Sequence, residues 1–156
     1  MKIRDLATRV GQEVAVSPWV EIAQERIDTF AKAIDDFQWI HVDRERARNS
    51  PFGGTIAHGF LTLSLLSHLS ERTFGFADRK MGVNYGLNRV RFTAPVPSGS
   101  RVRARFVLAK LERIEGNGVQ VTCTPPSSGS NFARVKRART REPAGTGEVK
   151  RTRFRP

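Results

Sequence analysis

The feature that most constrains the fold of this chain is an apolar stretch, residues 55–69, which follows a loop rich in glycine and proline. In a helix, its hydrophobic side chains would cover most of the circumference instead of forming one stripe. Such a helix needs other elements around nearly all of its surface. The stretch contains two histidines and is too short to cross a bilayer. It therefore predicts a helix enclosed within a protein core.

Alternating patterns downstream of this helix predict antiparallel strands. Apolar and polar residues alternate over residues 81–92 and again over residues 102–114. In the second segment, four apolar side chains share one face: Val102, Ala104, Phe106 and Leu108. A turn signal at residues 115–118 and a further alternating segment at residues 119–124 continue the meander. A sheet wrapped around one long helix explains why that helix is apolar on all sides.

The residues before the central helix predict an extended segment and two helical ones. Residues 14–22 are typical of a strand that is interrupted at Pro18. Residues 24–34 place apolar side chains at helical spacing, and this amphipathic pattern stops near Asp35. Asp43 then follows a short loop and can cap a further helical turn.

Charge is distributed unevenly along the 156 residues. The formal net charge of +12 suggests attraction to polyanions at long range. However, residues 125–156 hold 9 of the 27 Lys and Arg residues and only 2 of the 15 Asp and Glu residues. We therefore expect one folded domain, residues 1–124, followed by a basic tail, residues 125–156, with too few hydrophobic residues to become ordered.

Two explanations of this tail stay open. It is either a basic extension that binds polyanions or the product of out-of-frame translation. The first is suggested by a dense cationic run: Arg134, Lys136, Arg137, Arg139 and Arg141. The second, which we favour, is suggested by the abrupt change at Pro125 to Arg, Pro, Gly, Ser and Thr without hydrophobic periodicity. It fails if neither other reading frame downstream of codon 124 encodes an alternating strand.

Cysteine usage and the first residues indicate a cytoplasmic protein without a membrane anchor. The single cysteine, Cys123, excludes an internal disulfide and a cysteine-based zinc cluster. Residues 1–10 contain basic side chains but no apolar stretch of signal-peptide length.

Three segments carry a resemblance to a known family. They are Asp-Phe-Gln-Trp-Ile-His-Val-Asp at residues 36–43, Gly-Gly-Thr-Ile-Ala-His-Gly-Phe-Leu at residues 53–61, and residues 84–99. Together they resemble the MaoC-like dehydratases and (R)-specific enoyl-CoA hydratases, in particular the branch related to nodulation protein N. The similarity covers about residues 14–124. It implies an α+β hot-dog fold, in which an antiparallel sheet wraps a long central helix.

The resemblance also implies that a strand is missing. Family members usually finish with two further strands, the last of which lies inside the sheet. This chain supplies the first of them, residues 119–124, and then no segment with the pattern of the second. An interior gap leaves unpaired backbone groups on both sides and uncovers the central helix.

The activity implied by the resemblance is hydration of a 2-enoyl thioester, or dehydration of an (R)-3-hydroxyacyl thioester. The expected substrate is an acyl-CoA, and the expected assembly is a homodimer. Asp36 is the implied principal base, while His41 orients the water and shares its proton. The backbone N–H of Gly59, at the start of the buried helix, would polarise the thioester carbonyl. No metal and no redox cofactor is required.

Three further residues are candidates for substrate binding. His58 either lines the site or makes a local hydrogen bond at the helix start. Arg89 and Arg91 alternate with apolar neighbours and share the opposite strand face, where they either meet coenzyme A phosphates or remain solvated. We expect His68 at the less buried end of the helix and Cys123 to be chemically inert.

An interpretation from a different functional class remains. The chain would then be a non-catalytic or damaged hot-dog protein whose basic tail binds nucleic acid or another polyanion. Activity that is lost with Asp36 but survives removal of the tail would favour the enzyme. Salt-sensitive nucleic-acid binding that disappears with the tail would favour the binding protein.

Overall fold

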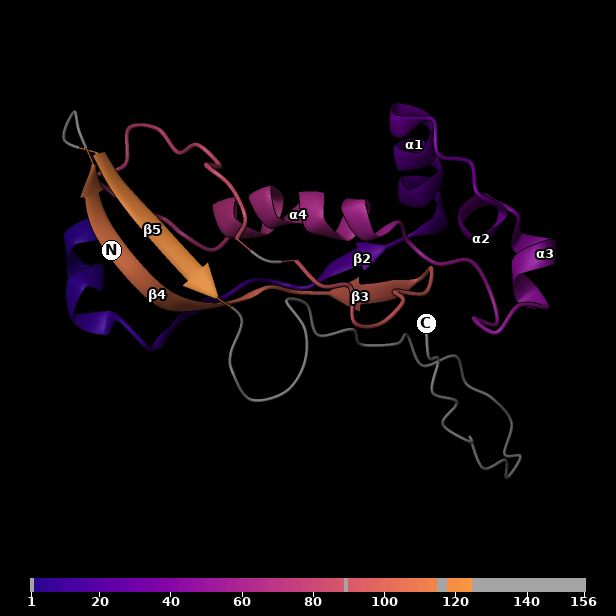
Figure 1. Ribbon diagram of the computed structural model, residues 1–156, viewed down its shortest axis with the longest axis horizontal. Helices are drawn as coiled ribbons and strands as arrows, with labels where there is room; N and C mark the ends of the chain where they lie inside the picture. Colours follow the sequence, from indigo (N-terminus) through magenta and orange to yellow (C-terminus); the bar gives the residue numbers. More distant parts are fainter. Residues whose placement is uncertain (1, 89, 115–117, 125–156) are drawn as a thin grey trace, which may run out of the picture.

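The structure of the chain is a computed structural model that describes residues 2–88, 90–114 and 118–124. Figure 1 shows its helices and strands in sequence colours. In chain order they are η1 (Ile3–Arg9), β1 (Glu13–Val16), β2 (Val20–Ile22), α1 (Gln24–Ile34), α2 (Trp39–Val42), α3 (Arg44–Arg48), α4 (Gly59–Glu71), β3 (Ser100–Val102), β4 (Arg105–Ile114) and β5 (Gly118–Thr124). The strand pairs are antiparallel, so the predicted α+β class is confirmed.

The strands form two small sheets, one in the order β1-β4-β5 and the other pairing β2 with β3. The break between β1 and β2 falls at Pro18, as the sequence predicts, because proline has no N–H to donate. Ser17 bridges the break: its N–H donates to the carbonyl of Ala104, and its hydroxyl accepts from the N–H of the same residue, both at 2.9 Å. The two sheets therefore remain connected along the chain.

The predicted helices before the central one are confirmed. The amphipathic helix α1 buries Ile27 and Ala31 and ends where the pattern stops. Asp43 caps α3, accepting a hydrogen bond of 2.9 Å from the N–H of Arg46. The predicted loop around His41 is instead one helical turn, α2.

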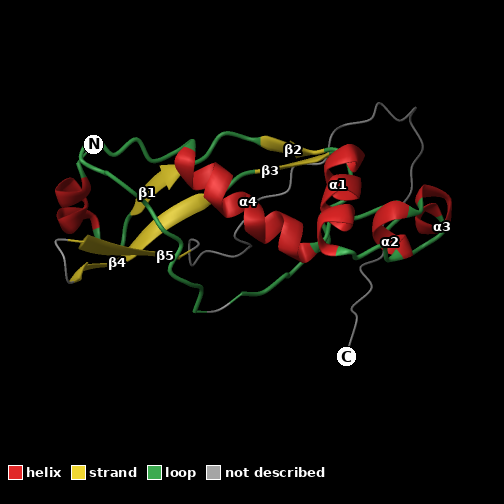
Figure 2. Cartoon of the chain, turned by 90° about the horizontal axis from the view of Figure 1, so that it is seen from above, coloured by secondary structure: helices red, strands yellow, loops and turns green. Residues whose placement is uncertain are grey.

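Helix α4 lies along the strands: Figure 2 shows its far end beside β1 and β4, and Figure 1 shows it above β2 and β3. One stripe of its side chains is buried: Leu61, Leu65 and Leu69. These pack in the main core with residues of β2 and with the predicted apolar face of β3 and β4. Phe60 points away from the core and is 67% exposed. The predicted enclosure on nearly all sides is therefore wrong for the single chain.

The segment 81–92 departs most from the expectation, because it forms no strand among its described residues. Its large apolar side chains are exposed, and Tyr85 reaches 90%. An extended segment becomes a strand only when a neighbour accepts and donates its backbone hydrogen bonds. Among the described residues, β5 is an edge strand that pairs only with β4, and no strand pairs with the segment 81–92. The predicted loss of an interior strand concerns residues after 124, which lie outside the described residues, and stays a prediction.

Two predictions fall outside the described residues. The predicted turn after β4 includes residues 115–117, although the pairing of Ile114 with Gly118 brings the two strands together as expected. The predicted basic tail, residues 125–156, lies wholly outside, so the boundary at residue 124 stays a prediction. In the part of the chain that is described, no helix is long and apolar enough to cross a membrane.

Candidate active site

Asp36 owes its position to the way α1 ends. The residue before it, Asp35, adopts a left-handed conformation with φ of 54°, which terminates the helix. The N–H of Asp36 then donates to the carbonyl of Ala31 at 3.1 Å. The carboxylate is left in the connection to α2, where Oδ1 accepts from the N–H of Gln38 at 3.2 Å. Its side chain is about one-third exposed, so it remains in reach of water.

His41 is buried on α2, and its protonation is set by one hydrogen bond. Its Nδ1 lies 2.7 Å from the carbonyl oxygen of Ile56. A carbonyl can only accept, so Nδ1 carries the proton and Nε2 of the neutral ring keeps its lone pair. Burial lowers the pKa of His41 and outweighs the opposing effect of the Ile56 carbonyl. The ring is therefore a neutral base whose free nitrogen is Nε2.

The carbonyl of Ile56 is held by backbone contacts on both sides. The N–H of Ile56 donates to the carbonyl of Ile40 at 3.0 Å. Its neighbour Ala57 donates to the carbonyl of Val96 at 2.8 Å, which ties the segment to the chain before β3. The acceptor that fixes the His41 ring is thus part of the folded framework.

Gln24 is a member of this site that the sequence did not reveal. Its buried side-chain amide donates to the backbone carbonyl of His41 and to Asp28, both at 2.8 Å. The amide oxygen accepts from the hydroxyl of Thr55, the residue before Ile56. Gln24 therefore links α1 to both segments that hold the His41 ring. A polar residue at a helix start carries no sequence signal for such a role.

His58 lies against both residues of the predicted catalytic pair. Its ring stacks on the ring of His41, with centroids 3.7 Å apart and planes inclined by 27°. Its Nε2 is 3.1 Å from the backbone carbonyl of Asp36 and 3.9 Å from carboxylate Oδ2. His58 is the N-cap residue of α4, but its side chain makes no hydrogen bond to that helix. The predicted alternative of a local hydrogen bond at the helix start is therefore wrong.

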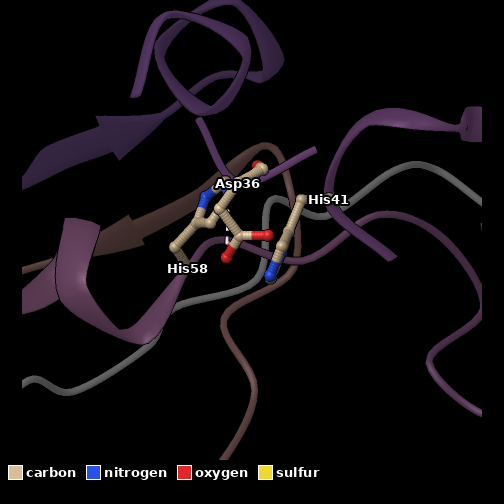
Figure 3. A group of neighbouring side chains, drawn as sticks. All are labelled: Asp36, His41 and His58. Carbon is tan, nitrogen blue, oxygen red and sulfur yellow. Dashed lines mark hydrogen bonds and ion pairs between the residues drawn. The ribbon is translucent and has the colours of Figure 1, made fainter. Parts of the chain in front are cut away.

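The three side chains form one group, drawn in Figure 3. One potential ligand atom from each, on Asp36, His41 and His58, lies within 4.8 Å of the others. A metal ion must lie in the plane of each imidazole that binds it, about 2.0–2.1 Å from the nitrogen. Two rings stacked at 3.7 Å cannot both meet that requirement. The arrangement therefore suits proton transfer and does not fit a metal centre.

Gly59 is the first residue of α4, so its N–H has no acceptor within the helix. The side of Gly59 on which a Cβ would stand is in contact with the ring of Phe92. A Cβ added to Gly59 would lie 2.9 Å from Phe92 Cδ2, closer than real side-chain contacts. Only glycine therefore fits here without displacing Phe92. The Phe92 ring forms one wall beside the helix start.

The remaining described candidates contribute no atom to the group of Asp36, His41 and His58. Arg91 is exposed on the irregular segment 81–92, and Arg89 lies outside the described residues. His68 is exposed near the far end of α4, as predicted. Burial raises the pKa of the Cys123 thiol, which disfavours the reactive thiolate and agrees with the expected inertness.

Comparisons with known proteins agree on one family. Residues 5–129 match the family described as "MaoC like domain". Over 120 residues the chain is 52% identical to 3-hydroxyacyl-thioester dehydratase Z of Mycobacterium tuberculosis, covering 77% of this chain and 80% of that protein. Over 114 residues it is 53% identical to nodulation protein N of Rhizobium leguminosarum bv. viciae, covering 72% and 71%.

A solved structure extends the similarity to the fold. The (R)-hydratase from A. caviae, described as involved in PHA biosynthesis, superposes with a TM-score of 0.55 at 25% identity. The superposition covers 73% of this chain and 91% of that one. The hot-dog fold predicted from the sequence is confirmed by this likeness.

Proposed function

The chain belongs to the family of proteins with a MaoC-like domain, and on that basis we propose that it is a lyase acting on acyl thioesters. It removes water from (R)-3-hydroxyacyl thioesters and, in reverse, adds water to 2-enoyl thioesters. The observation that carries the proposal is the meeting of Asp36 and His41 next to the helix start at Gly59. It is supported by a relative named as a 3-hydroxyacyl-thioester dehydratase and by the likeness to an (R)-hydratase.

Asp36 and His41 act together on one water molecule. The carboxylate and the unprotonated Nε2 of His41 are both acceptors, so a water between them is oriented and made more nucleophilic. In the hydration direction the water oxygen attacks C3, and Asp36 takes the proton that is released. The electron pair of the C2–C3 bond moves into the thioester. Return of that proton to C2 completes the addition of water.

Gly59 stabilises the negative charge that builds on the thioester oxygen during this reaction. Its N–H lacks a partner within α4 and lies at the positive end of the helix dipole. Removal of one donor of this kind commonly costs about 10²–10³ in kcat. The absent side chain lets the thioester approach the N–H, and the Phe92 ring borders that approach.

Arg91 is the remaining proposed contact for the carrier. Its exposed guanidinium is free to meet a phosphate of coenzyme A, and Arg89, for which the same role was predicted, lies outside the described residues. His58 was also a candidate for substrate binding, but its ring faces Asp36 and His41. An Arg91→Ala variant should raise KM for an acyl-CoA and leave kcat unchanged.

The carrier, the assembly and the location belong to the same proposal. We expect coenzyme A thioesters as substrates, a homodimer that covers part of the exposed apolar surface, and a cytoplasmic enzyme. The opposing hypothesis of a polyanion-binding protein depends on residues 125–156, and no observation on residues 2–124 favours it.

The first experiment is hydration of crotonyl-CoA by the full-length chain beside its Asp36→Asn variant. Loss of the ultraviolet absorbance of the enoyl thioester reports turnover. We expect turnover by the wild-type chain and a loss of at least about 100-fold in the variant, in line with the contribution of a positioned general base. Circular dichroism of both proteins serves as the control for folding. A folded wild-type chain without turnover on enoyl thioesters would contradict the proposal.

A further inference from the structure

We propose that His58 is a positioning residue that holds Asp36 and His41 in their working arrangement and does not itself bind substrate. The inference rests on the proposed lyase function and assigns a role within the same site. His58 makes contact with both members of the pair and immediately precedes Gly59 in the chain. It is the one described side chain that joins the acid–base groups directly to the start of α4.

The hydrogen bond to Asp36 fixes which nitrogen of His58 carries the proton. The backbone carbonyl of Asp36 can only accept, so Nε2 at 3.1 Å is the donor. Nδ1, the other ring nitrogen, takes no part in this hydrogen bond. It is buried and has no hydrogen-bond partner among the described residues. An unsatisfied buried polar atom destabilises the folded state. A hydrophobic residue would avoid this cost, so the histidine is explained by what its other nitrogen holds.

The stacked rings give His58 a second means of positioning. The His58 side chain is only 3% exposed and is wedged between the rings of Phe30 and His41. The His41 ring is thus fixed at its edge by the Ile56 carbonyl and on one face by His58. Together with the hydrogen bond to the Asp36 carbonyl, these contacts fix the distance between the Asp36 carboxylate and Nε2 of His41. Misplacement of a catalytic group by about 1 Å can cost about 100-fold in rate.

Three variants separate this role from substrate binding. In His58→Gln the amide nitrogen is three bonds from Cβ, as Nε2 is in histidine, so the donor to Asp36 is retained. His58→Leu removes the donor but keeps an apolar side chain in the core. The matched control is His68→Gln on the exposed side of the same helix. All three are measured as full-length chains with crotonyl-CoA.

We expect His58→Leu to lower kcat by about 10–100-fold with KM nearly unchanged. His58→Gln should recover most of that loss, and His68→Gln should match the wild-type chain. A rise in KM without a fall in kcat would overturn the proposal and make His58 a substrate contact. Equal losses in the Gln and Leu variants would also overturn it, because the donor would then be irrelevant.

A second measurement does not depend on activity. Nitrogen-15 NMR of the histidine side chains distinguishes a protonated ring nitrogen from a bare one. We expect His58 to carry its proton on Nε2 and His41 on Nδ1. A proton on Nδ1 of His58 would overturn the positioning role, even in an active enzyme. If instead this pattern is observed in a chain that turns over no enoyl thioester, the proposed function fails while the geometry stands.

Discussion

The two ends of α4 lie in very different surroundings. At its start, His58 is almost fully buried, the His41 ring contacts the carbonyl of Ile56, and the backbone carbonyl of Asp36 accepts from His58. Beyond its end, the segment 81–92 exposes one large apolar side chain after another. Among the described residues, the polar side chains of the site are brought together, whereas the segment 81–92 forms no strand. The site depends on contacts among α1, α2 and the residues before α4, and the N–H of Ala57 ties these residues to the carbonyl of Val96.

The largest effect on activity is expected near the start of α4, from a substitution of His41. A His41→Gln variant replaces the imidazole by an amide that cannot take up a proton. We expect kcat for hydration of crotonyl-CoA to fall by about 10²–10⁴, the usual contribution of a positioned acid–base group. The melting temperature of the variant should fall, because the Gln amide nitrogen is one bond further from Cβ than Nδ1 is and does not reproduce the donor to the Ile56 carbonyl. Wild-type kcat in this variant would remove His41 from the chemistry.

Next in size is the effect of filling the space at Gly59. In Gly59→Ala the new methyl group meets the ring of Phe92, which borders the proposed approach of the thioester. We expect kcat/KM to fall by about 10–100-fold, less than the loss expected when a donor is removed entirely.

The double variant Gly59→Ala with Phe92→Ala separates packing from chemistry. Removing the Phe92 ring relieves the clash, so thermal stability should recover, whereas the methyl group still hinders the substrate and activity should not recover. If activity returned fully in the double variant, Gly59 would serve only to accommodate Phe92. The Phe92→Ala single variant provides the baseline for both measurements.

A smaller effect is expected from pH. Burial lowers the pKa of His41 below its ordinary value of about 6.5. The unfolded chain therefore takes up a proton at a higher pH than the folded chain does. His41 stabilises the fold fully above about pH 6.5, and this contribution is lost as the pH falls through the lowered pKa of the folded state. In urea unfolding, the free energy of unfolding of the wild-type chain relative to that of His41→Gln should stay constant above about pH 6.5 and fall as the pH drops below it. A difference that instead grew above pH 7 would contradict a neutral His41.

The sequence predicted much of the site and less of the fold around it. Asp36, His41 and Gly59 were predicted because their spacing and flanking residues match a family, and the structure places Asp36 and His41 beside His58, the residue before Gly59. Gln24 was missed because a long-range hydrogen bond from a helix start leaves no local pattern. The segment 81–92 was predicted as a strand because alternation records which side chains share a face. Alternation cannot record whether a neighbouring strand exists to complete the hydrogen bonds.

The smallest effect is expected in the exposed segment 81–92, from a substitution of Tyr85 that is measured through the free energy of unfolding. Its side chain is 90% exposed, so a Tyr85→Ser variant removes almost no contact within the chain. We expect the free energy of unfolding in urea to change by less than about 0.5 kcal/mol, as for most surface substitutions. Leu65→Ala, in the buried stripe of α4, should cost about 2–5 kcal/mol and serves as the contrast. Both are measured at two protein concentrations. A loss in Tyr85→Ser at both concentrations would mean that the segment packs on its own chain. A loss of stability only at the higher concentration would mean that a second copy covers the segment 81–92. The surroundings of the two ends of α4 would then differ in the single chain but not in the assembly.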